Sequence, residues 1–173
     1  EPEIEIEKAA MRDSVPKLNR AKLETVILYI TELSGARPRM DISLLLNMFY
    51  FCDFNHFELH EEQLTGLLYT KQPAGPSPEK IHSILKEMEN AAKLHRIKSS
   101  YKGIPHYKYL PGVNPDMKKL SAAEKGVIDG VIEHYSGGPA RALSNYACED
   151  MPLRATKPGE PIDYELVFYR KPP

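Results

Sequence analysis

The fold of this chain is decided by the stretch Leu44-Leu45-Leu46-Asn47-Met48-Phe49-Tyr50-Phe51-Cys52, which leaves almost no polar face over two helical turns. A helix that is apolar all round must be enclosed by other elements of its domain. Asp41 stands before the stretch as a candidate N-cap, and the polar residues Glu58 to Gln63 follow it. We therefore predict a central buried helix around which the rest of the chain packs.

Four further helices are predicted from apolar residues spaced three and four apart. One runs from the cap Asn19 to Ser34, and one from Pro78, capped by Ser77, to Leu94. A capping box at 121–124 opens the next helix, which ends at Gly137-Gly138, and Pro139 starts the last. The residues expected to face inward are Leu23, Val26, Ile27, Ile30 and Leu33; Ile81, Ile84, Leu85, Met88 and Ala92; Val127, Ile128, Val131, Ile132 and Tyr135; and Leu143, Tyr146 and Ala147.

The β-structure predicted from the sequence is small. Arg96 to Leu110 is typical of a hairpin that turns at Lys102-Gly103. Three prolines and a glycine within 72–78 favour a stiff, irregular loop, and 163–170 suits a short helix or a strand equally. The predicted fold class is mainly α (α+β): a compact bundle of about five helices around a central hydrophobic helix, with a small β-hairpin.

Composition is that of one globular domain, with 42% hydrophobic and 27% charged residues in 173. We expect residues 19–170 to form that domain and residues 1–18 to be an N-terminal extension, either an edge strand or disordered. Because the chain begins with Glu1, we expect a trimmed chain or a start at Met11. The longest uncharged stretch, 42–52, has 11 residues, against about 20 for a membrane span. The two cysteines, Cys52 and Cys148, suggest a reducing cytoplasm.

Charge is unevenly distributed although the net charge is only −1. Residues 41–70 contain five acids and no Lys or Arg, whereas residues 93–119 contain seven basic residues and one acid. The balanced total disfavours a dedicated nucleic-acid domain. Such a polarised molecule is suited to orienting a charged partner.

Two alternative functions remain open on the residues alone. Cys52, His56 and His60 have spacings that suit a zinc site, but Phe57 stands where a hydrolytic zinc helix carries its glutamate. A winged-helix regulator is the other alternative, with 78–94 as recognition helix and 96–110 as wing. No nucleophile motif is present, so we expect no catalytic residues, no metal and no cofactor.

Several segments resemble the Panacea domain of SocA-like antitoxins, over about residues 20–170. Leu45 to His56 resembles the family's Leu-x-Tyr-Phe-Ala-Asp helix, Leu64 to Tyr69 its Thr-Gly-x-x-Tyr segment, and Gly75 to Pro78 its Gly-Pro-x-Pro turn. The stretch Ala155 to Ile162 follows in the same order. The chain departs from the pattern at Ala74, where an aromatic is usual, and near 145–153, where many members have His and Trp.

The resemblance implies a non-enzymatic antitoxin that neutralises a co-encoded toxin by direct binding, in a bacterium or phage. It implies a second route as well, in which an adaptor hands the toxin to a AAA+ protease. Because the family's toxins are diverse, it does not identify the partner. We expect partner contacts at Tyr50, Asp53, His56 and Tyr69, with core packing the stronger interpretation for Tyr50. Gly66, Gly75, Pro76 and Pro78 are expected to shape the connection between the second and third helices.

Overall fold

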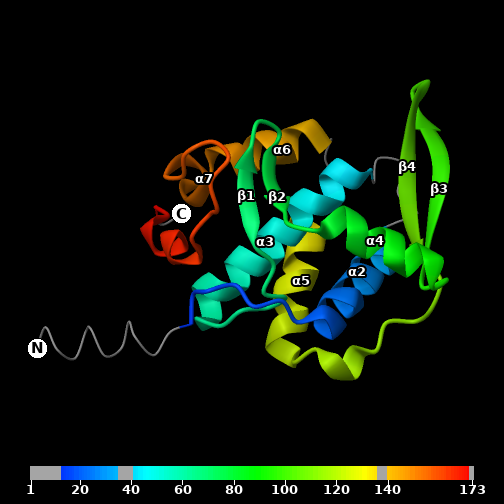
Figure 1. Cartoon of the computed structure of the whole chain (residues 1–173), viewed down its shortest axis with the longest axis horizontal. Helices are drawn as coiled ribbons and strands as arrows, with labels where there is room; N and C mark the ends of the chain where they lie inside the picture. The colour runs from blue at the N-terminus through cyan, green and yellow to red at the C-terminus, as the bar shows by residue number, and fades with distance from the viewer. Residues whose placement is uncertain (1–12, 35–40, 136–139, 172–173) are drawn as a thin grey trace, which may run out of the picture.

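The computed structural model describes residues 13–34, 41–135 and 140–171, and Figure 1 shows their arrangement. Helices make up most of the regular structure, beside two antiparallel two-stranded sheets. The mainly helical prediction is confirmed. The expected strand at the N-terminus and the predicted stops at Gly35 and Gly137-Gly138 lie outside the described residues, as does Pro139.

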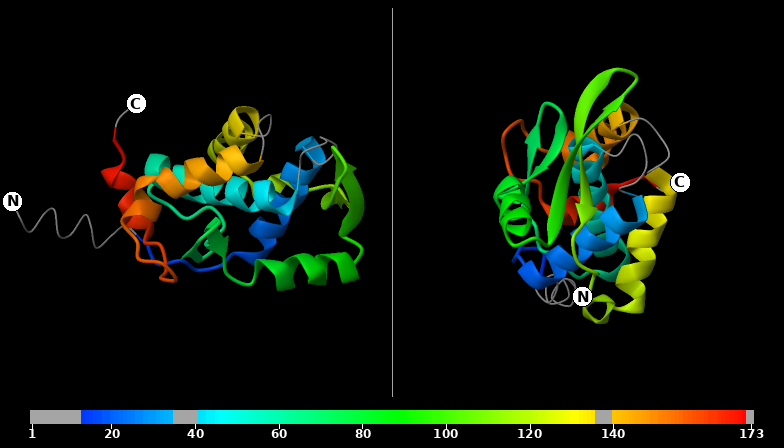
Figure 2. Two further views of the ribbon diagram at one scale, coloured as in Figure 1. Left: turned by 90° about the horizontal axis from the view of Figure 1, so that it is seen from above. Right: turned by 90° about the vertical axis from the view of Figure 1, so that its right-hand side faces the viewer.

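Helix α3 (Ile42–His60) runs through the middle of the molecule, in Figure 1 and in both views of Figure 2. Asp41 caps it by accepting a 2.9 Å hydrogen bond from the Leu44 N–H, and Glu61 ends it in the left-handed conformation at φ 55°. It packs against helices and strands from the middle of the chain and from its C-terminal part. The central helix predicted from its composition is confirmed, and its buried apolar side chains are Leu44, Leu45, Met48, Phe49, Tyr50, Phe51, Cys52, Phe54 and Phe57.

Helix α2 (Arg20–Ser34) begins as predicted, because Asn19 Oδ1 accepts a hydrogen bond from the Lys22 N–H at 3.1 Å. Its predicted stripe is buried except for Leu33, which is exposed. That prediction was wrong because Leu33 lies at the margin of the stripe, about 80° around the helix from Leu23.

A β-hairpin replaces the irregular loop expected at 72–78. Strands β1 (Tyr69–Gln72) and β2 (Gly75–Pro78) pair antiparallel, with Tyr69 opposite Pro78. The prediction was wrong because β2 is an edge strand, where proline is tolerated. The other side of β1 is also paired, since the Ile162 N–H donates to the Tyr69 carbonyl at 2.8 Å.

Helix α4 (Ile81–Asn90) begins later than predicted, since Ser77 and Pro78 belong to β2. Its N-cap, Lys80, has φ 63° and makes no side-chain capping bond. The extended chain continues beyond β2 because the Glu79 N–H donates to the Leu68 carbonyl at 2.7 Å. The helix stops before Ala92, which is exposed rather than inward-facing, and the predicted inward face is otherwise buried: Ile81, Ile84, Leu85 and Met88.

The hairpin predicted at 96–110 is confirmed as β3 (Leu94–Tyr101) and β4 (Ile104–Pro111). Its turn residues, Lys102 and Gly103, both have positive φ, as a two-residue hairpin turn requires. Leu94 and Tyr109 anchor its base in the core, while the outer part stands at one end of the molecule (Figure 2).

The remaining elements are η1 (Met117–Lys119), α5 (Ala122–Tyr135), α6 (Ala140–Glu149), α7 (Met151–Arg154) and η2 (Tyr164–Tyr169), a 3₁₀-helix in the segment that periodicity left open. The capping box is confirmed, because Ser121 and Glu124 exchange hydrogen bonds of 2.8 and 3.1 Å. Tyr146 is exposed rather than inward-facing, since α6 buries only the narrow face of Leu143 and Ala147.

Candidate functional site

Asp53, the acid among the predicted site residues, has no solvent exposure. Its carboxylate accepts hydrogen bonds from the backbone N–H of Thr65 at 2.9 Å, from the Thr65 hydroxyl at 2.7 Å, and from the Tyr69 hydroxyl at 2.5 Å. Burial raises the pKa of Asp53 to about 6, although the hydrogen bonds from Tyr69 and Thr65 favour the charged form. Asp53 therefore ties α3 to the segment that leads into β1.

Aromatic rings enclose this carboxylate. Phe54 stacks on Tyr164 with ring centroids 4.1 Å apart, and Tyr69 meets Tyr50 edge to face at 5.8 Å. The Tyr164 hydroxyl donates to the Leu67 carbonyl at 2.6 Å. Burial, and then the charge of Asp53, raise the pKa of Tyr69 well above its ordinary value, so this phenol stays a hydrogen-bond donor.

The structure brings three of the four predicted contact residues together, but inside the molecule. Tyr50, Asp53 and Tyr69 share one cluster, and none of them reaches the surface. His56 lies apart, with its ring 4.7 Å from that of His60, and it too is buried. Partner contact by these side chains stays a prediction. In the arrangement described here, they support the surface rather than form it.

His56 carries an unsatisfied group. Its Nδ1 is buried and has no hydrogen-bond partner among the residues that the structure describes. Burial, followed by the neighbouring charge of His60, lowers the pKa of His56, so the ring is favoured in its neutral form. Within the described ranges, no three His, Cys, Asp or Glu side chains are grouped so that they would hold a metal ion. Burial also raises the pKa of the Cys52 thiol well above its ordinary value.

One of the expected structural residues, Gly66, lies just before the β1–β2 hairpin, and the other three lie in β2 itself. Gly66 has φ 75°, and a Cβ added there would lie 1.9 Å from the carbonyl oxygen of Lys17. Only glycine fits such a close backbone approach. Gly75, Pro76 and Pro78 are buried in β2, where it packs against α3. Their role in shaping this connection stays a prediction, for which the geometry at Gly66 supplies a physical reason.

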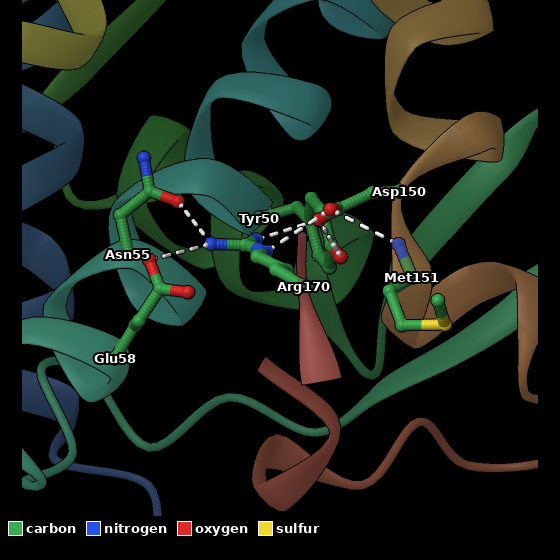
Figure 3. A network of polar contacts seen from close by, with 6 residues as sticks. All are labelled: Tyr50, Asn55, Glu58, Asp150, Met151 and Arg170. Atoms are coloured by element: carbon green, nitrogen blue, oxygen red, sulfur yellow. Dashed lines mark hydrogen bonds and ion pairs between the residues drawn. The ribbon is translucent and has the colours of Figure 1, made fainter. Parts of the chain in front are cut away.

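A second polar network lies where α3, α7 and the C-terminal segment meet (Figure 3). The Tyr50 hydroxyl donates to Asp150 Oδ2 at 2.6 Å, and Arg170 donates to both Asp150 oxygens, at 2.5 and 3.0 Å. Arg170 also donates to Asn55 Oδ1 at 2.8 Å and reaches Glu58 at 3.5 Å. Asp150 caps α7 as well, through the Met151 N–H at 3.1 Å.

The ion pair between Arg170 and Asp150 at the centre of this network is largely shielded from solvent. The side chains of Arg170 and Asp150 are 15% and 14% exposed. Burial disfavours the charged guanidinium, but the hydrogen bonds and charge of Asp150 outweigh it and raise the pKa of Arg170. Burial and the charge of Asp150 likewise raise the pKa of Tyr50 well above its ordinary value. Arg170 and Tyr50 therefore both keep their protons near neutral pH, and the network is an ion pair to which a tyrosine hydroxyl also donates.

A surface hollow of about 540 Å³ lies over this network. A second hollow, of about 420 Å³, shares Asn55 and Tyr135 with the first and continues along α5. We call the two together the α3–α5–α6 groove. Its residues are Phe51, Asn55, Tyr135, Tyr146, Glu149, Asp150, Arg170 and Lys171 in the first part, and Leu59, Gly126, Val127, Gly130, Val131 and His134 in the second.

The groove combines apolar and aromatic side chains with a charged rim. Phe51 stacks on Tyr135 at 4.6 Å, and Tyr135 meets Tyr146 at 6.2 Å. Tyr146 and Leu59 are 61% and 66% exposed. Exposed tyrosine beside apolar and arginine side chains is the composition favoured at protein–protein contacts.

Sequence reasoning missed the residues that form the groove floor. Asp150 could have been found, because an Asp followed by Met151-Pro152 has the pattern of a capped helix start. Arg170 lies in a short C-terminal segment without periodicity, so no local signal pointed to it. The exposure of Tyr146 was missed because its spacing alone placed it on the inner face of α6.

Comparison with known proteins gives a match to a family model. The chain matches the family model described as "Antitoxin SocA-like, Panacea domain" over residues 45–152, from the start of α3 to the start of α7. No curated protein and no solved structure matches it. Of the helices within the described ranges, none is long and apolar enough to cross a bilayer.

Proposed function

The chain belongs to the SocA-like antitoxin family with a Panacea domain, and from that premise we propose that it neutralises a co-encoded toxin by binding it directly in the cytoplasm, without catalysis. The family match is the observation that carries this proposal. In this view residues 19–170 act as one domain, and the toxin is held stoichiometrically rather than modified.

The α3–α5–α6 groove is the proposed toxin contact. No element within the described ranges covers Tyr146 and Leu59 there, and large exposed apolar groups in a hollow are typical of a binding surface. Arg170 is already held in place by Asp150, so its side chain loses little conformational entropy when the toxin binds. This pre-organisation favours a tight, stoichiometric complex.

The residues predicted from sequence take an indirect role in this proposal. Tyr50 holds Asp150, which in turn holds Arg170 at the groove floor. Asp53 and Tyr69 fix α3 against β1 from the inside. Replacing them would alter the toxin surface only through the fold.

Co-expression with the neighbouring open reading frame tests the proposal. The neighbour should arrest growth by itself, growth should return with this chain, and the two proteins should co-purify. A neighbour that is harmless alone contradicts the proposal. The toxin's half-life in the same strains separates the two routes, because delivery to a AAA+ protease shortens it and stoichiometric inhibition does not.

A pair of tyrosine variants locates the contact. Tyr146→Ala should weaken toxin binding about tenfold or more, as expected when an aromatic anchor is removed. Tyr107→Ala, at another exposed tyrosine on the β3–β4 hairpin, is the matched control and should bind as the wild type does. Equal loss in both variants would remove the groove from the proposal.

A further inference from the structure

The α3–α5–α6 groove has helical walls. Its floor follows one line of α3, in which Phe51, Asn55 and Leu59 stand four residues apart and so lie one above another. Helices α5 and α6 each pack against α3 and contribute side chains to the groove. From Phe51 to Leu59 the floor is about 12 Å long, roughly two turns of a helix.

A segment that enters this groove has to satisfy its own backbone hydrogen bonds. None of the strands in the described part of the chain contributes a residue to the groove. In helices α3, α5 and α6 the backbone N–H and C=O groups are bonded within each helix, except at its ends. An extended segment would find no strand edge with which to pair, whereas a helix enters with its backbone already paired.

Helix α5 offers such a helix a wall without side chains. Gly126 and Gly130 are one turn apart and exposed, and apart from the backbone of α5 a Cβ at either would meet no described atom within 4 Å. Packing inside the described part of the molecule therefore does not require glycine there, although glycine weakens a helix interior. On the outer side, the missing side chains allow a second helix to approach more closely than the usual distance of about 8–10 Å between helix axes.

The helices that form the groove carry negative charge. Together α3, α5 and α6 contain six acidic and two basic residues, a net charge of −4, whereas the whole chain carries −1. Glu133 on α5 is exposed and lies about 20° around the helix from the first of the two glycines, and Glu149 is exposed in the first hollow. Within the described ranges neither acid forms an ion pair. In the first hollow Arg170 is already paired with Asp150, and Lys171 adds one exposed cation. The charge around the groove therefore favours a basic partner.

We propose that the α3–α5–α6 groove binds an amphipathic α-helix of the toxin, which carries apolar side chains on one face and Lys or Arg residues beside that face. The apolar face contacts Leu59 and Tyr146, the closest approach of the two backbones is at Gly130, and the basic residues meet Glu133 and Glu149. This proposal rests on the proposed function and adds the kind of toxin segment that is bound. An extended segment, and a flat surface made of several segments, are the alternatives that the experiment distinguishes.

The first measurement is the affinity of this chain for the purified protein encoded by the neighbouring reading frame. Gly130→Leu should weaken binding about tenfold or more, because the new side chain occupies the space of the incoming helix. Ser83→Leu, at an exposed position of α4, is the matched control and should bind as the wild type does. Thermal unfolding of each variant checks that the fold is intact.

A second pair of variants tests the charge of the bound helix. Glu133→Lys with Glu149→Lys should weaken binding about tenfold at low salt and less at high salt, because like charges then face each other. Glu79→Lys with Glu160→Lys makes the same change of charge at exposed sites off the groove, and should have a much smaller effect.

Photo-crosslinking identifies the shape of the bound segment. A diazirine amino acid is placed in turn at positions 59, 134 and 146, and the residues of the neighbour's protein that become linked are read by mass spectrometry. The linked residues should lie in one segment, three or four apart, with Lys or Arg among their neighbours. Links two residues apart indicate an extended segment, and links to several segments indicate a flat surface. Either of these patterns overturns the proposal.

The affinities separate failure of this proposal from failure of the proposed function. Unchanged affinity in Gly130→Leu, or equal losses in a groove variant and its matched control, overturns the proposal. In these cases the wild-type chain still binds the neighbour's protein, so the proposed function stands. A wild-type chain that does not bind that protein contradicts the proposed function itself, and this proposal with it.

Discussion

The Tyr50 hydroxyl, in the middle of α3, donates a 2.6 Å hydrogen bond to Asp150, a residue 100 positions further along the chain. Arg170 approaches the same carboxylate from the C-terminal segment and donates to both of its oxygens. One carboxylate therefore joins the central helix, the start of α7 and the end of the chain. The same three parts form the floor of the α3–α5–α6 groove.

Removing the guanidinium should leave Asp150 charged, shielded and short of a partner. We expect Arg170→Met, which keeps much of the apolar stem, to lower the free energy of unfolding by about 2 kcal/mol. Urea unfolding measures the change. In a double-mutant cycle with Asp150→Asn, the two effects should be coupled by more than about 0.5 kcal/mol. Simple additivity would show that the pair contributes nothing beyond its separate parts.

Asp53 should make the protein more stable in mild acid than at neutral pH. Its pKa is raised from 3.8 to about 6 in the folded state, so the folded state holds the proton more tightly than the unfolded state does. Its contribution to the free energy of unfolding is therefore greatest below about pH 4 and falls as pH rises toward 6, by up to about 3 kcal/mol. The difference in stability between the wild type and Asp53→Asn, measured by urea unfolding from pH 4 to 7, should follow this curve.

The comparison with Asp53→Asn matters because other groups titrate in the opposite sense. The pKa of His56 is lowered, chiefly by burial, so its contribution is lost as pH falls through its ordinary range. Both proteins contain His56, and its effect cancels in the difference. Glu79→Gln, at an exposed turn, is the control for the loss of one acidic side chain. A flat difference for Asp53→Asn would mean that this carboxyl keeps an ordinary pKa.

Two glycines of similar backbone conformation should differ sharply when replaced by alanine. Gly66 and Gly103 have φ 75° and 79°, but a Cβ at Gly66 would collide with the Lys17 carbonyl, whereas at Gly103 it would meet no described atom within 4 Å. Gly103→Ala should cost about 1 kcal/mol, the strain of the left-handed conformation alone. Gly66→Ala should cost more than about 2 kcal/mol, because the segment before β1 must also shift. Equal losses in thermal or urea unfolding would exclude the collision as the cause.

Gly126 and Gly130 should show the reverse behaviour. Both lie inside α5, and apart from the backbone of that helix a Cβ at either would meet no described atom within 4 Å. Each change to alanine should stabilise the protein by about 0.5 to 1 kcal/mol, because glycine is a poor helix former. Both residues line the groove, so toxin binding should weaken as the protein becomes more stable. Gain of stability with unchanged binding would limit the proposed contact to the part of the groove near Tyr146.

Local chemistry made much of the fold predictable. The apolar run in α3 has to be buried in any fold, and Asn19, Asp41 and Ser121 cap their helices through partners only three residues away. The turn at Lys102-Gly103 needs only two residues with positive φ. Such features depend on neighbours in sequence, so the sequence reveals them.

The errors arose where distant partners decide the outcome. The proline-rich stretch became β2 because β1 lies beside it, and Glu79 continued the extended chain by bonding to Leu68. Tyr50, Asp53, His56 and Tyr69 were predicted to contact a partner, which stays a prediction. Tyr50, Asp53 and Tyr69 lie together, whereas His56 lies apart beside His60. Their residue types did not reveal that the cluster faces inward.

The sequence by itself determined that this chain builds a helical domain on one buried apolar helix, because hydrophobic patterning and capping act over a few residues. Only the tertiary structure decided which charges meet. Asp150 finds Tyr50 and Arg170, and the groove above them forms, because packing of α3, α6 and η2 brings together side chains that no local pattern links. Hydrogen bonds between such distant residues form only once the core has set the distances between them.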